Sequence, residues 1–232
     1  MTTTTISTGS SALDTLLGGG VHTGMITDIY GESGSGKSQM CFTLCANCAK
    51  EGVRTFFIDT AGTFRPERII DISRLHQVLE SITYLRAFTT FDQIKAINKI
   101  LEIGPTLIVV DTLTSLFSAE YSGPTRHLAI MSYLHKLARL AITTESAVVV
   151  TNMIRTKPIT VLDQAGRNIA NAIVPSQQRE YLGSSVSIYS HMKIKLEIID
   201  NTKSWFQAIL VQPAGKGSAP FAISAQGISD MR

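Results

Sequence analysis

The stretch Gly31-Glu32-Ser33-Gly34-Ser35-Gly36-Lys37-Ser38 decides the expected fold. It matches the pattern G-x-x-x-x-G-K-[ST], which forms a phosphate-binding loop where it stands between a strand and a helix. Residues Met25 to Tyr30 before it are mostly apolar or β-branched, and residues Gly36 to Glu51 after it have a helical pattern. The motif therefore lies in the context that it needs, which favours a nucleotide site over a chance glycine-rich turn.

The motif predicts a different role for each part of the loop. Its backbone N–H groups and the start of the following helix favour phosphate, Lys37 reaches the terminal phosphates, and the Ser38 hydroxyl is placed for Mg²⁺. The second half of such a site is an acidic residue at the end of a buried strand, and Asp111 follows Leu107-Ile108-Val109-Val110. A strand-terminal aspartate alone is more often a turn former or helix cap, but its pairing with the loop favours a role in holding Mg²⁺.

Strands and helices alternate along most of the chain. Beyond the first strand we expect buried strands at Thr55–Asp59, Thr106–Asp111 and Ala147–Asn152, and helices at Phe91–Ile103 and Thr125–Ala141. This alternation predicts an α/β fold with a mainly parallel central sheet and helices on both faces. After Gly183 the pattern changes to closely spaced strands that predict a C-terminal antiparallel extension, at Ser185–Tyr189, Lys193–Ile199, Trp205–Val211 and Pro220–Ser224.

Length and composition set the class of protein. The 232 residues are 44% hydrophobic and 17% charged, which is enough to bury a full core and excludes a disordered chain or a coiled rod. We expect a single domain over residues 1–232, in the cytoplasm, because no apolar run approaches about 18 residues and the first residues do not resemble a signal peptide. Cys41, Cys45 and Cys48 share one helix face; without a fourth ligand nearby, packing is favoured over metal binding.

The basic residues are concentrated in the C-terminal part of the chain. Ile154 to Gly217 holds eight basic and four acidic residues, whereas the whole chain has a net charge of +3. That region includes Arg155 to Leu182, a long polar stretch that we expect to be a flexible loop, because a loop of this length in a compact domain is usually functional or disordered. Charge alone leaves open whether it meets a polyanion or only solvent.

The chain resembles a known family in several further motifs. They are Ile58-Asp59-Thr60, Gly62-Thr63-Phe64-Arg65-Pro66-Glu67-Arg68, Arg86-Ala87-Phe88, Tyr121-Ser122-Gly123 and Val149-Val150-Thr151-Asn152. In this order and spacing they look like the ATPase core of the archaeal RadA and eukaryotic recombinases of the RecA superfamily. The resemblance runs from about Ile6 to Asp230, and a core of this size without the N-terminal helical domain is similar to the archaeal paralogue RadB.

The resemblance implies a RecA-like fold and roles for individual residues. Gly31, Glu32, Ser33, Gly34, Ser35, Gly36, Lys37, Ser38 and Gln39 would bind ATP, Ser38 and Asp111 would hold Mg²⁺, and Arg68 would lie against the adenine. Residues Ser118 to His127 would correspond to a first DNA-binding loop and residues 155–182 to a second. The second loop carries four candidate phosphate contacts, Arg155, Lys157, Arg167 and Arg179. Tyr181 is its one candidate for stacking on a base, so binding is expected to be mostly electrostatic.

Two positions depart from the family pattern. Ala61 stands where the family has the glutamate that activates water, and losing a general base typically costs about 10²–10⁴-fold in rate. Met153 stands where relatives have a glutamine that senses the γ-phosphate, and Met cannot make that hydrogen bond. No catalytic residue is therefore assigned.

These features predict an archaeal-type recombinase paralogue or mediator in DNA recombination and repair. It would bind ATP, Mg²⁺ and single-stranded DNA with weak or absent hydrolysis, and work with a RadA-type recombinase, other repair proteins or further copies of itself. Two alternatives remain open: an active filament-forming recombinase, and a RecA-like signalling subunit that does not bind DNA.

Overall fold

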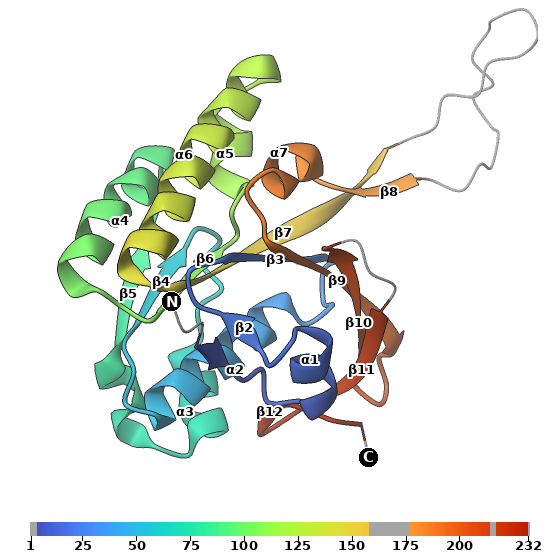
Figure 1. Cartoon of the computed structure of the whole chain (residues 1–232). Coiled ribbons are helices and arrows are strands. Elements are labelled where there is room, and N and C mark those ends of the chain that lie inside the picture. The colour runs from blue at the N-terminus through green and yellow to red at the C-terminus, as the bar shows by residue number, and fades with distance from the viewer. Residues whose placement is uncertain (1–3, 158–176, 214–216, 232) are drawn as a thin grey trace, which may run out of the picture.

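The computed structural model describes residues 4–157, 177–213 and 217–231 of the chain, and a large twisted sheet organises them (Figure 1). Its strands are β3 (Ile26–Gly31), β4 (Thr55–Asp59), β5 (Ile82–Arg86), β6 (Leu107–Asp111), β7 (Ala147–Lys157), β8 (Gln177–Glu180), β9 (Met192–Asp200), β10 (Trp205–Gln212), β11 (Gly217–Ser224) and β12 (Gly227–Ser229). Within the described ranges they run in the order β12-β11-β10-β9-β3-β7-β6-β4-β5, with β8 paired to β7. Strands β5, β4, β6, β7, β3 and β9 are parallel, whereas β9 to β12 pair antiparallel. The expected α/β class and C-terminal extension are confirmed.

Helices cover both faces of this sheet. They are α1 (Ser11–Leu16), α2 (Lys37–Lys50), α3 (Pro66–Ser73), α4 (Thr90–Ile103), α5 (Ser115–Glu120), α6 (Gly123–Thr144) and α7 (Gly183–Ser187), with a 3₁₀ turn at His76–Ser81 and a short β1–β2 pair (Thr5–Ile6 and Val21–His22). Helices α1 to α3 lie on one face and α4 to α6 on the other (Figure 1). No helix in the described part of the chain is both long enough and apolar enough to cross a bilayer.

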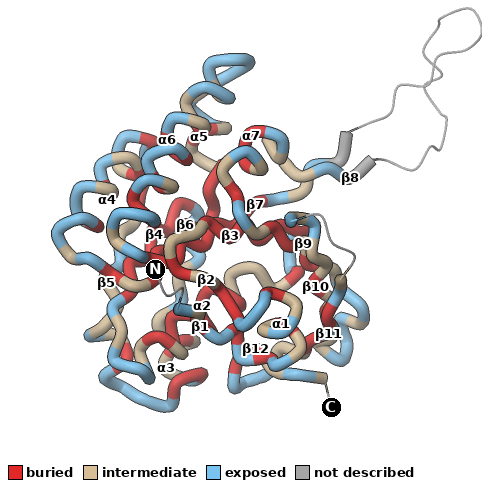
Figure 2. Tube along the Cα trace, viewed as in Figure 1, coloured by how far each residue is buried: buried red, intermediate tan, exposed pale blue. Residues whose placement is uncertain are grey.

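Side chains of the central strands alternate between two hydrophobic cores. Phe57 and Val109 face the core built with α2 and α3, while Phe56 and Ile108 face the core built with α4 and α6. Successive residues of a strand point to opposite faces, so a continuous apolar run fills both layers. The buried residues accordingly follow the strands through the middle of the molecule (Figure 2).

The three cysteines of α2 belong to the first of these cores. Cys41, Cys45 and Cys48 are all buried, and burial raises the pKa of each thiol, that of Cys48 to about 12. They serve the packing role that their spacing favoured.

Two expectations about secondary structure were wrong. Residues Ser185–Tyr189 are not a strand: α7 occupies Gly183–Ser187, and its Val186 is buried in the second core. The α7 backbone turns on itself, because the N–H groups of Ser185 and Val186 donate to the Leu182 carbonyl. Strand β7 also continues past Asn152 to Lys157 and pairs with β8, so residues 155–157 and 177–180 of the expected loop at 155–182 are strand. Residues 158–176 lie outside the described structure.

Candidate functional site

The phosphate loop connects β3 to α2 at the centre of the sheet. Strand β3 ends at Gly31 and α2 begins at Lys37, as the motif predicts. A Cβ on Gly31 would lie 2.5 Å from the Leu196 carbonyl oxygen of the adjacent strand β9, so only glycine fits there. Gly36 caps the helix with φ of +93°, a conformation that other residues rarely adopt. The loop therefore leaves its backbone N–H groups and the start of α2 available to an anion.

Lys37 lies over this loop. Its ammonium group donates to the carbonyl oxygens of Gly31 (3.0 Å) and Glu32 (2.5 Å). Burial lowers the pKa of Lys37, although the nearby Asp111 carboxylate opposes that shift. A cation held at the mouth of the loop is placed to meet a bound phosphate.

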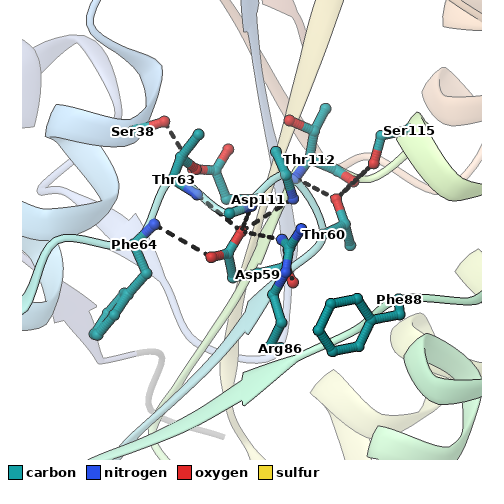
Figure 3. Close-up of polar contacts among 12 residues, drawn as sticks. Ser38, Asp59, Thr60, Thr63, Phe64, Arg86, Phe88, Asp111, Thr112 and Ser115 are labelled. Atoms are coloured by element: carbon teal, nitrogen blue, oxygen red, sulfur yellow. Dashed lines mark hydrogen bonds and ion pairs between the residues drawn. The ribbon is translucent and has the colours of Figure 1, made fainter.

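Asp111 lies opposite the loop, at the end of β6, and is 2% exposed. One of its carboxylate oxygens accepts hydrogen bonds from the hydroxyls of Ser38 (2.7 Å) and Thr63 (3.3 Å), and the other accepts from Thr151. The Ser38 and Asp111 side chains meet directly (Figure 3). Hydroxyl and carboxylate oxygens are the donors that Mg²⁺ prefers, so this pair fits the predicted metal.

Asp59 fixes the conformation of the next loop, which contains Ala61. It ends β4, its side chain is 1% exposed, and it accepts four hydrogen bonds from the backbone N–H groups of residues 61–64 at 2.6–3.2 Å. Arg86 adds an ion pair at 3.0 Å (Figure 3). Burial alone would raise the pKa of Asp59, but these N–H donors, that of Phe64 foremost, hold the pKa below its usual value. These contacts hold the backbone of the loop, which carries a methyl group at residue 61.

Both loops border one pocket of about 660 Å³. Its lining comprises Ser33, Gly34, Gly36, Lys37, Ser38, Gln39, Ala61, Thr63, Arg68, Asp111, Thr112, Met153, Ser204, Phe206, Ile223, Ser224 and Ala225. Asp111 is the one carboxylate among these described lining residues. Gly31, Glu32 and Ser35 of the predicted set do not line the pocket.

Arg68 reaches the pocket from α3 and is held by three contacts. Its Nε donates to the Gln39 side chain at 2.8 Å, and its Nη atoms donate to the carbonyls of Ala225 (2.8 Å) and Ser224. The contact of Arg68 with an adenine stays a prediction, but its planar group is fixed beside the apolar wall of Phe206 and Ile223. Such a wall suits a purine ring.

Comparison with known proteins agrees with this geometry. The Rad51 family matches residues 1–231. The chain belongs to the Rad51 family. Its relatives include the "DNA repair and recombination protein RadA" of Cenarchaeum symbiosum, 36% identical over 73% of this chain and 47% of that protein. The protein of the same name from Metallosphaera sedula is 39% identical over 66% of this chain and 53% of that protein.

A plant relative matches almost the whole chain. The "DNA repair protein RAD51 homolog B" of Zea mays is 32% identical over 98% of this chain and 70% of that protein. The chain thus spans about half the length of the RadA proteins that it matches. The expected RecA-like recombinase core is confirmed, whereas the individual site residues stay predictions.

The predicted DNA-binding residues of this Rad51-family core are only partly described. Arg155 on β7 and Arg179 on β8 are exposed and face each other in the strand register. Lys157 ends β7, and Arg167 lies outside the described residues. The region expected as a first DNA loop, Ser118–His127, is mostly helical, because α5 ends at Glu120 and α6 begins at Gly123.

Two polar arrangements near this surface could not be seen in the sequence. Arg126 of α6 donates to the Tyr181 hydroxyl at 2.5 Å, across 55 residues of chain. Lys193 of β9 is 3% exposed and pairs with two buried carboxylates, Glu180 of β8 at 2.5 Å and Asp28 of β3 at 3.1 Å. Burial, reinforced by the Glu180 charge, raises the pKa of Asp28 well above its usual value.

Proposed function

We propose that this Rad51-family core binds ATP and Mg²⁺ and hydrolyses ATP slowly or not at all. The observation that carries this proposal is the pocket lining: the phosphate loop and the Ser38–Asp111 pair are in place, while Ala61 occupies the loop that faces them. Asp111, the one carboxylate of the described lining, is engaged by three hydroxyls and suited to the metal. A carboxylate already committed to Mg²⁺ is a poor base for the attacking water.

When bound, Mg²⁺ would neutralise charge on the terminal phosphates. Ser38 and Asp111 would hold it, and Lys37 and the α2 N-terminus would bind the phosphate oxygens. The apolar wall and Arg68 would orient the base. These residues supply binding and orientation, but the described lining offers no second carboxylate to accept a proton from water.

The same core would bind single-stranded DNA and act as a recombinase paralogue or mediator in recombination and repair. Arg155 and Arg179, exposed on the paired strands β7 and β8, support this assignment, as do the names of the relatives. We propose the outer strand β5 as the place where a protein partner or a second copy docks. There a groove of about 500 Å³ runs between β5 and α4, and Phe88 at its rim is 72% exposed. Such a groove beside an edge strand can accept a partner's strand.

The test compares binding with turnover. We expect a fluorescent ATP analogue to bind with Mg²⁺, Lys37→Ala to abolish binding, and phosphate release with single-stranded DNA to stay below about 0.1 s⁻¹. Ordinary turnover by the unaltered protein would contradict the proposal.

The two alternative functions predict different results. Long helical filaments with ATP and single-stranded DNA in electron micrographs would favour an active recombinase. DNA affinity that is absent at low salt, or flat against log[salt], would favour a protein-binding subunit, because phosphate contacts make affinity fall steeply as salt rises.

A further inference from the structure

Tyr181 occupies a fixed position where β8 leaves the sheet. Its backbone N–H donates to the Met153 carbonyl at 2.9 Å, and its carbonyl accepts from the Asn152 side chain at 2.7 Å. Asn152 is itself buried and held by the Thr114 hydroxyl at 2.8 Å. The position of the tyrosine is therefore held by contacts with the folded core.

Two guanidinium groups hold the Tyr181 ring. The Arg155 Cζ atom lies 3.8 Å from the ring centroid, which is the distance of a stacked pair. Arg126 donates to the ring hydroxyl at 2.5 Å and is anchored by a second hydrogen bond, 2.6 Å long, to the Tyr121 carbonyl. One arginine thus lies over the ring and the other holds its polar end.

The acidic residue beside Tyr181 does not cancel this positive charge. Glu180 turns inward, where Lys193 pairs with it at 2.5 Å and the Asn152 amide donates to it at 2.7 Å. Arg155 and Arg179 remain exposed on neighbouring strands. The surface at the base of the β7–β8 pair therefore combines positive charge with a planar stack.

We infer that the Arg155–Tyr181 stack is a platform for an unpaired nucleobase, and that it makes this surface select single-stranded over double-stranded nucleic acid. The inference rests on the proposed DNA binding and adds the element that sets strand preference. A guanidinium plane accepts a base on its open face as readily as an aromatic ring does. In a duplex each base is already stacked on its neighbours, so only phosphates are offered to the arginines.

The experiment measures the affinity of labelled oligonucleotides, single-stranded and duplex, over a series of salt concentrations. Replacing Tyr181→Leu should lower single-strand affinity about 5- to 100-fold and leave duplex affinity within about twofold, since stacking contributes only to the unpaired strand. Arg155→Lys keeps the charge but loses the plane, so it should reduce the strand preference without changing the salt slope. Tyr189→Leu is the matched control, because the Tyr189 ring packs against His135, whereas Arg126 and Arg155 pack on Tyr181.

Tyr181→Phe keeps the measurement decisive if the leucine variant unfolds. It removes the hydroxyl held by Arg126 but retains the ring, and should preserve most of the strand preference. Equal single-strand and duplex affinities in the unaltered protein, or an unchanged ratio after Tyr181→Leu in a folded variant, would overturn the inference and leave the proposed DNA binding intact. No binding of either nucleic acid at low salt would instead refute the proposed function itself.

Discussion

Placing a carboxylate at residue 61 is the sharpest test of the catalytic argument. Ala61 is exposed, lines the nucleotide pocket, and has its backbone N–H fixed by the Asp59 carboxylate at 3.0 Å. An Ala61→Glu side chain would therefore extend into the pocket from a loop that already has its shape. The substitution should cost little stability, because an exposed side chain creates no clash with the core.

The expected increase in the rate of ATP hydrolysis follows from restoring a general base at residue 61. A positioned general base contributes about 10²–10⁴-fold, which corresponds to roughly 3–5 kcal/mol of activation free energy. We expect Ala61→Glu to raise DNA-stimulated phosphate release by a factor in this range. Ala61→Gln is the matched control, because it has nearly the same size and hydrogen-bonding reach but cannot accept the proton.

The assay measures phosphate release at saturating ATP and Mg²⁺, with and without single-stranded DNA. The Lys37→Ala variant gives the background rate. Equal rates for Ala61→Glu and Ala61→Gln would refute the reasoning, because the gain would then come from bulk or polarity. Unaltered protein that already turns over as fast as Ala61→Glu would show that another group performs the step.

The buried charges give three further predictions. Lys193→Met should lower the free energy of unfolding by about 3–5 kcal/mol in urea titrations, because it leaves two buried carboxylates without their cation; a loss under 1 kcal/mol would contradict the pairing. Asp28→Asn should cost less stability near pH 7 than Lys193→Met, because burial already opposes a charge on Asp28 and the neutral amide carries none; an equal or larger loss would contradict this. The pKa of Asp28, which Glu180 and Lys193 face, is higher in the folded protein than its unfolded value of 3.8. The stability of the unaltered protein should therefore fall as the pH rises from about 4. Thermal melts of the Asp28→Asn variant should show a shallower decline over the same pH range. The pKa of Asp59 shifts in the opposite direction, to below 3.8 in the folded protein. The stability that Asp59 contributes is therefore present above pH 3.8 and lost on acidification. Asp59→Asn should destabilise the protein most near neutral pH and little near pH 2.

The sequence predicted the nucleotide half of the molecule well because local rules decide it. Strand β3, the glycine loop and α2 follow one another within 25 residues, so neighbours in sequence are neighbours in space. Asp111 lies 73 residues after Ser38, but it ends an uninterrupted apolar strand, and the carboxyl ends of parallel strands meet at one edge of the sheet. The bounds of β4 agree with the expectation at both ends, and those of β6 agree to within one residue, for the same reason.

The polar network around β8 could not be predicted in this way. Lys193 alternates with Ile194 in a manner typical of an exposed lysine, yet it is 3% exposed because Asp28 and Glu180 approach it from β3 and β8. Residues Ser185–Tyr189 were misread for a related reason. Their β-branched and aromatic side chains favour a strand, but Lys193 donates to the Ser187 hydroxyl at 2.8 Å and packing of Val186 fixes a helical turn. Long-range contacts decided both cases.

Strand β7 connects the nucleotide pocket to the basic surface through consecutive residues. Thr151 donates to Asp111, and Met153 lines the pocket while its carbonyl accepts the Tyr181 N–H. Arg155, two residues further on, stacks on that tyrosine. A methionine side chain cannot hydrogen-bond a phosphate, so the direct link that residue 153 makes between the pocket and the basic surface is its backbone, through the pairing with Tyr181. A shift of β7 would move the Arg155–Tyr181 stack as a unit. Bound nucleotide would then change the position of the Arg155–Tyr181 stack, although the side chain at residue 153 makes no hydrogen bond to the γ-phosphate.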